Sequence, residues 1–204
     1  MNFFKKSSYP VHLGGTLTFR QQAIIFAWEV FKVVVISLVI IVPIRYYVIK
    51  PFYVKGASME PNFHDHEYLI IDEISYRFNQ PERGEIVVFK DPLQSGQYLI
   101  KRIIALPNER VTIKNGLITV YTADDKSGIL LQEPYLEPGT KTNGTVEVVL
   151  SPDEYLVLGD NRTHSLDSRI FGPIKRQAII GRVWWRGWPL DKMGVLTQPV
   201  EYNF

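Results

Sequence analysis

One segment near the amino terminus constrains the fold of this chain more than any other. From Ala23 to Ile49 the residues are almost entirely apolar, and the stretch from Val33 to Ile44 carries no charge. A helix that crosses a bilayer needs about 20 predominantly apolar residues. Val and Ile dominate the run and Pro43 interrupts it, which is also the pattern of a buried, β-rich core segment. Length and flanking residues favour a membrane anchor over residues 23–49.

Residues at both ends of this segment are those found at membrane interfaces. Lys32 and Arg45 can extend their charged ends to opposite surfaces, and Trp28, Tyr46 and Tyr47 are typical of aromatic belts. No small-x-small cleavage site follows the apolar run before Tyr46, so we expect it to remain as an anchor rather than to be removed as a leader. Charge does not set the orientation, because basic residues lie on both sides. They are Lys5, Lys6 and Arg20 before the segment, and Arg45, Lys50 and Lys55 after it.

After Lys50 the pattern changes to short strand-like runs separated by turn residues. Asn115-Gly116, between two such runs, is a strong signal for a two-residue hairpin turn. The sequence therefore predicts a mainly β domain over residues 50–204, with residues 1–22 preceding the anchor. Residues 122–144, rich in Gly, Pro, Thr and charge, are expected to form an insertion or long loop. The strand-like runs are 68–72, 85–90, 98–105, 110–113, 117–121, 146–150, 155–158 and 178–185.

Composition argues against several classes of function. A formal net charge of +2, without a Lys/Arg-rich run, gives no electrostatic footprint for nucleic-acid binding. The chain has no cysteine, which removes disulfides and thiolate metal sites. No cofactor and no metal ion are expected.

A serine framed by small residues follows the anchor, in Gly56-Ala57-Ser58-Met59-Glu60-Pro61. A hydroxyl is a weak nucleophile unless a base lies beside it. His64, His66 or His164 could be that base, since a His/Asp pair activates serine in many hydrolases. However, His64 and His66 lie in a charged HDHE run that is typical of a solvated loop. A histidine base is therefore the weaker hypothesis.

Lys101 is the stronger candidate for the base. Strand alternation places it on the same face as Leu99 and Ile103, where desolvation disfavours the charged ammonium. Lowering the pKa from about 10.4 toward 7 to 8 would take roughly 3 to 4 kcal/mol of differential solvation, and would give a base at neutral pH. The alternative, which the strand alone favours, is a lysine on an edge strand that prevents aggregation.

A polar loop from Gly159 to Arg169 directly follows the strand-like run 155–158. Asp167 and Arg169 alternate as in an extended segment and could pair, and Ser165 could hydrogen bond beside an amine. The plainer interpretation is a turn in which Asn and Asp tolerate the left-handed conformation. A loop so rich in hydrogen-bonding groups could orient a base.

Together these segments resemble the bacterial type I signal peptidases, the membrane-bound serine endopeptidases of the Ser/Lys class. The resemblance extends from the anchor to about Trp185. It implies a signal-peptidase β fold, and cleavage of amino-terminal signal peptides from secreted precursors after small residues. The segments that carry it are residues 56–61, which match GxSMxP; 83–89, similar to RGDIVVF; 98–109, similar to YIKRVIGLPGD; and 159–169, similar to GDNRxxSxDSR.

The resemblance also implies roles for individual residues. Ser58 matches the nucleophile, Lys101 the general base, and Ser165 the serine that orients the lysine. The Ser58 amide would form part of an oxyanion hole. Gly56 stands where some members add a serine hydroxyl, so the second donor would be the Gly56 amide or a water. Asp160, Asp167 and Arg169 would support the loop, and Phe52, Val54, Met59 and Ile100 would line the substrate pockets.

Four positions depart from the family pattern without removing a reactive group: Asn62 stands for threonine, and Ala105, Asn108 and Glu109 replace glycine, glycine and aspartate. They put the turn after the lysine strand in doubt. As partners the resemblance implies secretory preproteins, membrane lipid and the secretion translocon. It places the amino terminus in the cytoplasm and the catalytic domain outside the plasma membrane. The alternatives are a tethered β domain that binds peptides without cleaving them, a self-cleaving Ser/Lys regulator, and an anchored envelope scaffold.

Overall fold

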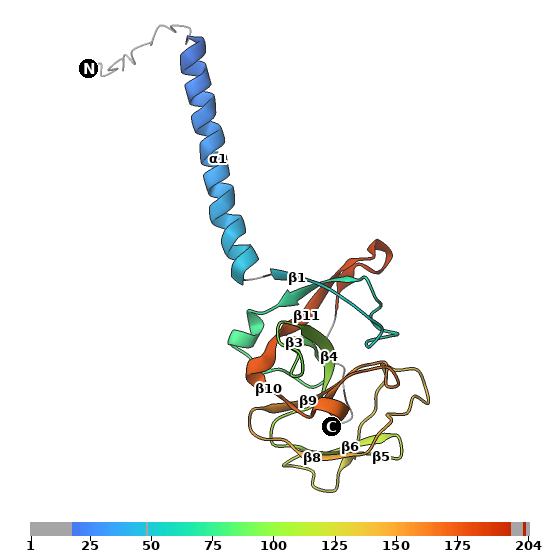
Figure 1. The fold of residues 1–204 in the computed structure, drawn as a ribbon. Coiled ribbons are helices and arrows are strands. Elements are labelled where there is room, and N and C mark those ends of the chain that lie inside the picture. The colour runs from blue at the N-terminus through green and yellow to red at the C-terminus, as the bar shows by residue number, and fades with distance from the viewer. Residues whose placement is uncertain (1–17, 48, 197–201, 203–204) are drawn as a thin grey trace, which may run out of the picture. The chain divides into compact units, whose positions relative to one another are not determined.

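The structure is a computed structural model that describes residues 18–47, 49–196 and 202 (Figure 1). The chain divides into two compact units, residues 1–43 and 44–204. Lys5 and Lys6 lie outside the described residues, as do the side chains of Arg45, Tyr46 and Tyr47. Their expected roles at the membrane interface therefore stay predictions.

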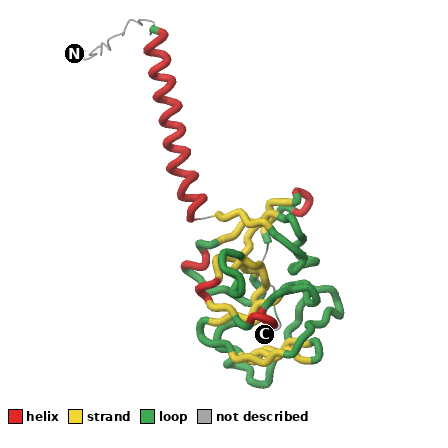
Figure 2. The backbone as a smooth tube through the Cα atoms, viewed as in Figure 1, coloured by secondary structure: helices red, strands yellow, loops and turns green. Residues whose placement is uncertain are grey.

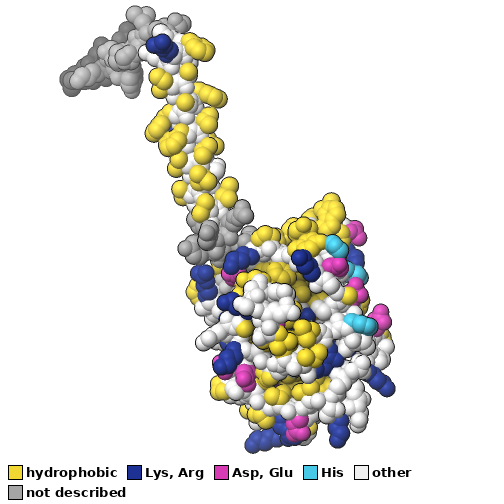
Figure 3. Space-filling view, in the orientation of Figure 1, with side chains coloured by type: hydrophobic (Ala, Val, Ile, Leu, Met, Phe, Trp, Pro, Cys, Tyr) yellow, Lys and Arg dark blue, Asp and Glu magenta, His cyan; other side chains and the backbone are white. Residues whose placement is uncertain are grey.

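The first unit contains most of helix α1, which spans Phe19–Tyr47. Its part Phe19–Val42, with a mean hydropathy of 2.5, is long and apolar enough to cross a membrane, and is the one such segment among the described residues. Figure 3 shows hydrophobic side chains along its surface. A helix that is apolar all round is stable in lipid or inside a large protein, and none of this stretch is buried in the structure. Among the described residues, this helix near the amino terminus fits a single-pass membrane anchor.

The second unit contains two antiparallel sheets (Figures 1 and 2). The larger has the order β1-β2-β11-β3-β4-β9-β10, with β12 paired to β11, and the smaller has the order β7-β6-β5-β8. Short helices are α2 (Ser168–Phe171), η1 (Ser75–Arg77), η2 (Arg176–Ala178) and η3 (Leu190–Lys192). The strands are β1 (Ile49–Tyr53), β2 (Tyr68–Asp72), β3 (Ile86–Lys90), β4 (Tyr98–Ala105), β5 (Arg110–Lys114), β6 (Leu117–Tyr121), β7 (Ile129–Leu130), β8 (Val146–Val149), β9 (Glu154–Leu158), β10 (Ile174–Lys175), β11 (Ile179–Trp188) and β12 (Gly194–Val195).

Strand β4 connects the parts of the core. Ile100 packs in a cluster with Val54 and Met59, whereas Ile103 packs in a second cluster on β3 and β9. Ile104 joins a third cluster, which includes the inward-facing residues of β5 and β6. Because its residues enter all three clusters, β4 is held from several directions, and its buried side chains are firmly positioned.

Local patterns predicted most strands well. The observed bounds of β2, β4 and β6 are those expected, and Asn115 and Gly116 both have positive φ, as the predicted hairpin turn requires. β1 was missed because Ile49–Tyr53 continues the apolar run that was assigned to the anchor. It contains Pro51, which is tolerated because β1 lies at an edge of its sheet. Residues 122–144 are mostly loop and contribute only the short strand β7.

Candidate functional site

Ser58 lies in a turn that follows β1 and is held by two loops. The Gly56 amide donates to Asp65 Oδ1 at 2.9 Å. From the loop after β9, the Asn161 amide donates to the Ser58 carbonyl at 3.1 Å, and Asn161 Nδ2 donates to the Ala57 carbonyl at 3.1 Å. Gly56 has a φ of +87°, which favours glycine. The serine is thereby fixed by backbone contacts on both sides.

Lys101 reaches this serine from the middle of β4. Its Nζ lies 2.8 Å from Ser58 Oγ and donates to the Ile100 carbonyl, also at 2.8 Å. The lysine is only 2% exposed. A lysine that prevents aggregation at a sheet edge must be exposed, so that alternative is wrong for this buried side chain. The partly exposed serine and the buried lysine, 43 positions apart, form one pair.

Burial changes the acidity of this lysine. Desolvation lowers the pKa of Lys101 from 10.5 to about 8, against the opposing charges of Asp167, Asp160 and Asp91, which raise it. The neutral amine is therefore accessible only a little above neutral pH. A neutral amine within hydrogen-bond distance of a hydroxyl can act as its general base.

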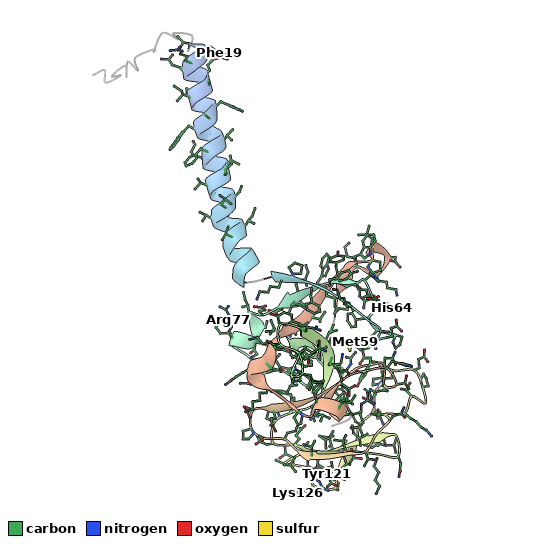
Figure 4. All side chains as sticks on the ribbon, in the orientation of Figure 1. Phe19, Met59, His64, Arg77, Tyr121 and Lys126 are labelled. Atoms are coloured by element: carbon green, nitrogen blue, oxygen red, sulfur yellow. The ribbon has the colours of Figure 1, made fainter. Side chains whose placement is uncertain are left out.

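The three histidines considered as bases make other contacts. His64 Nδ1 lies 3.6 Å from Glu67 Oε1, and His66 Nδ1 lies 3.0 Å from Asp65 Oδ2. His164 Nδ1 lies 2.8 Å from Thr163 Oγ1. All three are exposed, and Figure 4 shows His64 on an outer loop, with Met59 inside the unit. The structure favours Lys101 over each of them.

The loop after β9 is organised by Asp167. Its carboxylate accepts bonds from Arg169 Nε and Nη2 and from the Gly159 amide, and it also caps α2 by accepting from the Arg169 amide. Burial raises the pKa of Asp167, but the bonds from Arg169 and Gly159 outweigh it and hold the pKa below its ordinary value. The pairing of Asp167 with Arg169, expected from their alternation, is present.

Ser165 is close to the site, but it does not hydrogen bond to Lys101 in this structure. A Cβ added to Gly159 would lie 2.1 Å from Ser165 Oγ and 2.5 Å from the Ser58 carbonyl oxygen, so only glycine fits between them. The buried Ser165 hydroxyl makes no hydrogen bond of normal geometry, although it is near enough to Asp167 to help lower the pKa of that carboxyl. The proposed contact between Ser165 and the lysine is thus unformed.

Sequence reasoning missed a buried network on the other side of β4. Arg102 Nε and Nη2 donate to the two Asp160 oxygens at 2.9 and 2.7 Å. Asn62 Nδ2 donates to Asp160 Oδ2 at 2.8 Å and to the Tyr135 carbonyl at 2.9 Å. The Arg102 guanidinium also lies 3.8 Å from the centre of the Tyr135 ring. Strand alternation could have indicated that Arg102 faces away from Lys101, but not which carboxylate it meets.

The amides near Ser58 differ in their availability. No described residue accepts a hydrogen bond from the Ser58 amide, so it is free to face a substrate oxygen. The Gly56 amide, the expected second donor, is instead bonded to Asp65. In this conformation it cannot complete an oxyanion hole.

A cavity of about 520 Å³ contains the Ser58–Lys101 pair. Phe52 and Ile100 line it, as expected for substrate-pocket residues. Val54 and Met59 do not, because each is 1% exposed and packs in the core beneath. The walls of the cavity are the end of β1 and the start of β4.

Comparison with known proteins places this chain in a family. Residues 27–188 match the family model described as signal peptidase, peptidase S26. A probable signal peptidase I-2 of Synechocystis sp. is 39% identical over 179 residues, covering 85% of this chain and 78% of that protein. A signal peptidase I of Leptolyngbya laminosa is 36% identical over 182 residues, covering 85% and 86%. The crystal structure of a signal peptidase I from Enterococcus faecalis V583 is 27% identical, with a TM-score of 0.43, and covers 52% of this chain and 97% of that one.

Proposed function

The chain belongs to the S26 family of signal peptidases, which are serine peptidases, and on that premise we propose that Ser58 is its nucleophile and Lys101 its general base. The observation that carries the proposal is the 2.8 Å contact between the buried Lys101 Nζ and Ser58 Oγ. A buried amine with a lowered pKa beside a hydroxyl is the arrangement that activates a serine without histidine.

The reaction follows from these two groups. Neutral Lys101 Nζ accepts the Ser58 proton as Oγ forms a bond to the carbonyl carbon of the scissile peptide. The resulting ammonium then protonates the leaving amine, which frees the mature chain and leaves the other part of the substrate as an ester on Ser58. A water that gives its proton to the regenerated amine hydrolyses this ester.

Stabilisation of the oxyanion would come from the Ser58 amide. Fixed donors of this kind lower the barrier because they need no reorganisation when charge develops. Since the Gly56 amide is bonded to Asp65, we assign the second donor to a water rather than to Gly56.

Four further residues would position the pair. The Ser165 hydroxyl, buried beside Gly159 without a well-formed bond, could accept from the Lys101 ammonium after a small rotation. Asp167 and Arg169 would fix the loop that carries it. Asp160, through Arg102, would fix the strand that carries the lysine.

The substrate would be the signal-peptide region of a secretory precursor, bound in extended form. Residues 98–101 of β4 pair with β3 alone, because pairing with β9 begins at Arg102. β1 is also an edge strand. A peptide lying between these free edges could add a strand, with small side chains in the pocket lined by Phe52 and Ile100. Precursors present small residues just after their apolar segment.

The cleavage site of a precursor lies just after its apolar segment, so an enzyme anchored in the same bilayer can reach it at the membrane surface. We therefore place the amino terminus in the cytoplasm and the peptidase domain outside the plasma membrane, beside membrane lipid and within reach of the secretion translocon. The support is the single anchor followed directly by the catalytic strands.

An assay of the full chain in detergent or membranes tests the proposal. A precursor with an A-x-A site should be cleaved after the last small residue, as shown by sequencing the new amino terminus, and Ser58→Ala should abolish cleavage. Binding of the precursor without cleavage would favour a peptide-binding domain instead. Cleavage that persists in Ser58→Ala would refute the assigned nucleophile.

A further inference from the structure

A second cavity begins beside the nucleophile turn. Its volume is about 440 Å³, within the range of roughly 300–1,000 Å³ that is usual for ligand sites. Glu60 and Pro61, which follow Ser58 in the chain, form one side. Asn161, which binds the Ser58 carbonyl, forms another. The two cavities share no lining residue: Ser58 lines the first, whereas its chain neighbour Glu60 and its hydrogen-bond partner Asn161 line the second.

The outer wall of this second cavity comes from the segment Leu136 to Lys141. Arg162 fixes the residues on both sides of the segment: Nη1 donates to Glu133 Oε2 and to Thr142 Oγ1, each at 2.6 Å. The Arg162 Nε also donates to the Gly159 carbonyl at 3.0 Å, which ties the wall to the catalytic loop. Arg162 therefore connects the residues that flank this segment directly to the loop that follows β9.

Charges at the base of the cavity are neutralised, whereas those at its rim are not. Asp160 is paired with Arg102, and Arg162 with Glu133. Within the described part of the chain, the rim residues Glu60, Glu137 and Lys141 have no ion-pair partner. Two carboxylates facing one ammonium give the rim a net negative charge.

A peptide cleaved at Ser58 must continue past it on both sides. The cavity that contains Ser58 has apolar side chains from Phe52, Leu99 and Ile100, which suit the residues before the scissile bond. The second cavity is lined mainly by charged and polar residues, and it includes Glu60 and Pro61, which follow Ser58 in the nucleophile turn. Resting on the proposed function, we propose that it binds the first residues of the mature chain, and that Glu60 and Glu137 favour a basic side chain there over an acidic one.

Three synthetic precursor peptides test this selectivity. They are identical through the cleavage site and carry Lys, Gln or Glu at the second and third positions after it. For the full chain in detergent at low salt, we expect kcat/KM to fall from Lys to Gln to Glu, by about threefold or more in all. Since screening weakens exposed charges, the preference should decrease as salt is added.

Two variants show where the preference originates. The double substitution Glu60→Gln with Glu137→Gln should bring the three kcat/KM values together, and a denaturant-unfolding midpoint close to that of the wild type shows that the variant is folded. Glu82→Gln is the matched control, because it removes an exposed carboxylate that lines neither cavity. It should retain the wild-type preference.

Equal rates for the three peptides in the wild type would overturn the inference, as would an unchanged preference in the double variant. A double variant that instead altered selectivity for residues before the scissile bond would place the cavity on the wrong side. These outcomes differ from failure of the proposed function, in which no peptide is cleaved or cleavage survives Ser58→Ala.

Discussion

Two neighbouring cationic residues of β4 are both buried, but their pKa values are shifted in opposite directions. Lys101 and Arg102 are 2% and 3% exposed, and they face opposite sides of the sheet. Lys101 has a hydroxyl and a carbonyl as its partners, and burial lowers its pKa to about 8. Burial lowers the pKa of Arg102 too, but the carboxylate of Asp160 outweighs it and raises the pKa above its ordinary value.

Because both side chains are buried, it is the direct partner of each cation that determines whether its pKa is lowered or raised. A cation without a direct counter-charge is destabilised and gives up its proton readily, which is useful in a base. A cation with a bidentate carboxylate stays charged and becomes part of the framework. Substitutions on the two sides should therefore affect different properties: activity for Lys101 and stability for Arg102.

Lys101→Met should produce the largest effect. If Lys101 acts as the proposed general base, its removal should lower kcat/KM for a precursor by about 10³-fold or more. Unfolding of the variant should be no easier than that of the wild type, because a buried amine without a counter-charge is replaced by an apolar chain of similar length. Parallel measurement of cleavage and denaturant unfolding checks both. A large loss of stability together with activity would show that the lysine is mainly structural.

Arg102→Met should reverse this pattern. It leaves Asp160 buried with only Asn62 as a side-chain partner, which should cost about 3–5 kcal/mol in the free energy of unfolding. Denaturant titration measures the loss. The control is Arg110→Met, which breaks the exposed pair of Arg110 with Glu147 and should cost less than about 1 kcal/mol. Similar losses in the two variants would contradict the comparison.

The Lys101 side also predicts a pH dependence. Only the neutral amine accepts a proton, so kcat/KM should rise with pH through a midpoint near 8. Below pH 8 both the folded and unfolded chains hold the Lys101 proton, and the folded state bears the cost of the buried charge. Between about 8 and 10.5 the folded state loses the proton while the unfolded state keeps it, so this group adds stability as pH rises.

That stability gain can be measured as a difference between proteins. Relative to Lys101→Met, the wild type should become more stable by about 3 kcal/mol as pH rises across this window. Using the difference cancels other titrating groups that the two proteins share. A difference that stays constant from pH 7 to 10.5 would mean that the lysine keeps its ordinary pKa.

Parts of this comparison were accessible from sequence and parts were not. Strand β4 and the apolar face around Lys101 follow from alternation, which is a local property. The contact between Ser58 and Lys101 joins residues 43 apart, and no local pattern specifies it. Alternation made Lys101 a candidate base, and the resemblance to a family matched it to Ser58. From the strand alone, a lysine on a sheet edge was the favoured interpretation, because neither strand order nor burial by distant segments is a local property.

The remaining misses have the same origin. Arg102 and Asp160 are 58 positions apart, so their pairing depends on how β4 meets the loop after β9. The Gly56 amide donates to Asp65. Every residue except proline has a backbone amide, so residue type does not predict where this one donates. The resemblance implied that Val54 and Met59 line the substrate pockets, but both pack in the core. The sequence indicated candidate reactive residues, whereas their contacts depend on long-range folding that no local pattern specifies.

Asn62→Ala should have a moderate effect on the Arg102 side. Its side chain donates to Asp160 and to the Tyr135 carbonyl, so its loss leaves two acceptors short of a bond and should cost about 1–3 kcal/mol of stability. Asn62→Thr, the residue usual in the family, can replace one of the two bonds and should cost less. Thermal or denaturant unfolding measures the order. If both variants matched the wild type, the network would not depend on Asn62.

The smallest effect should come from a distant charge on the Lys101 side. Asp91 is buried, accepts from the amides of Leu93 and Gln94, and raises the pKa of Lys101 from a distance. Asp91→Asn keeps an acceptor oxygen for those amides but removes the charge, so the pKa of Lys101 should fall. The midpoint of the kcat/KM profile should then move to slightly lower pH, with the plateau at high pH unchanged. A lower plateau with an unmoved midpoint would show that Asp91 acts on the shape of the site rather than on the charge of the lysine.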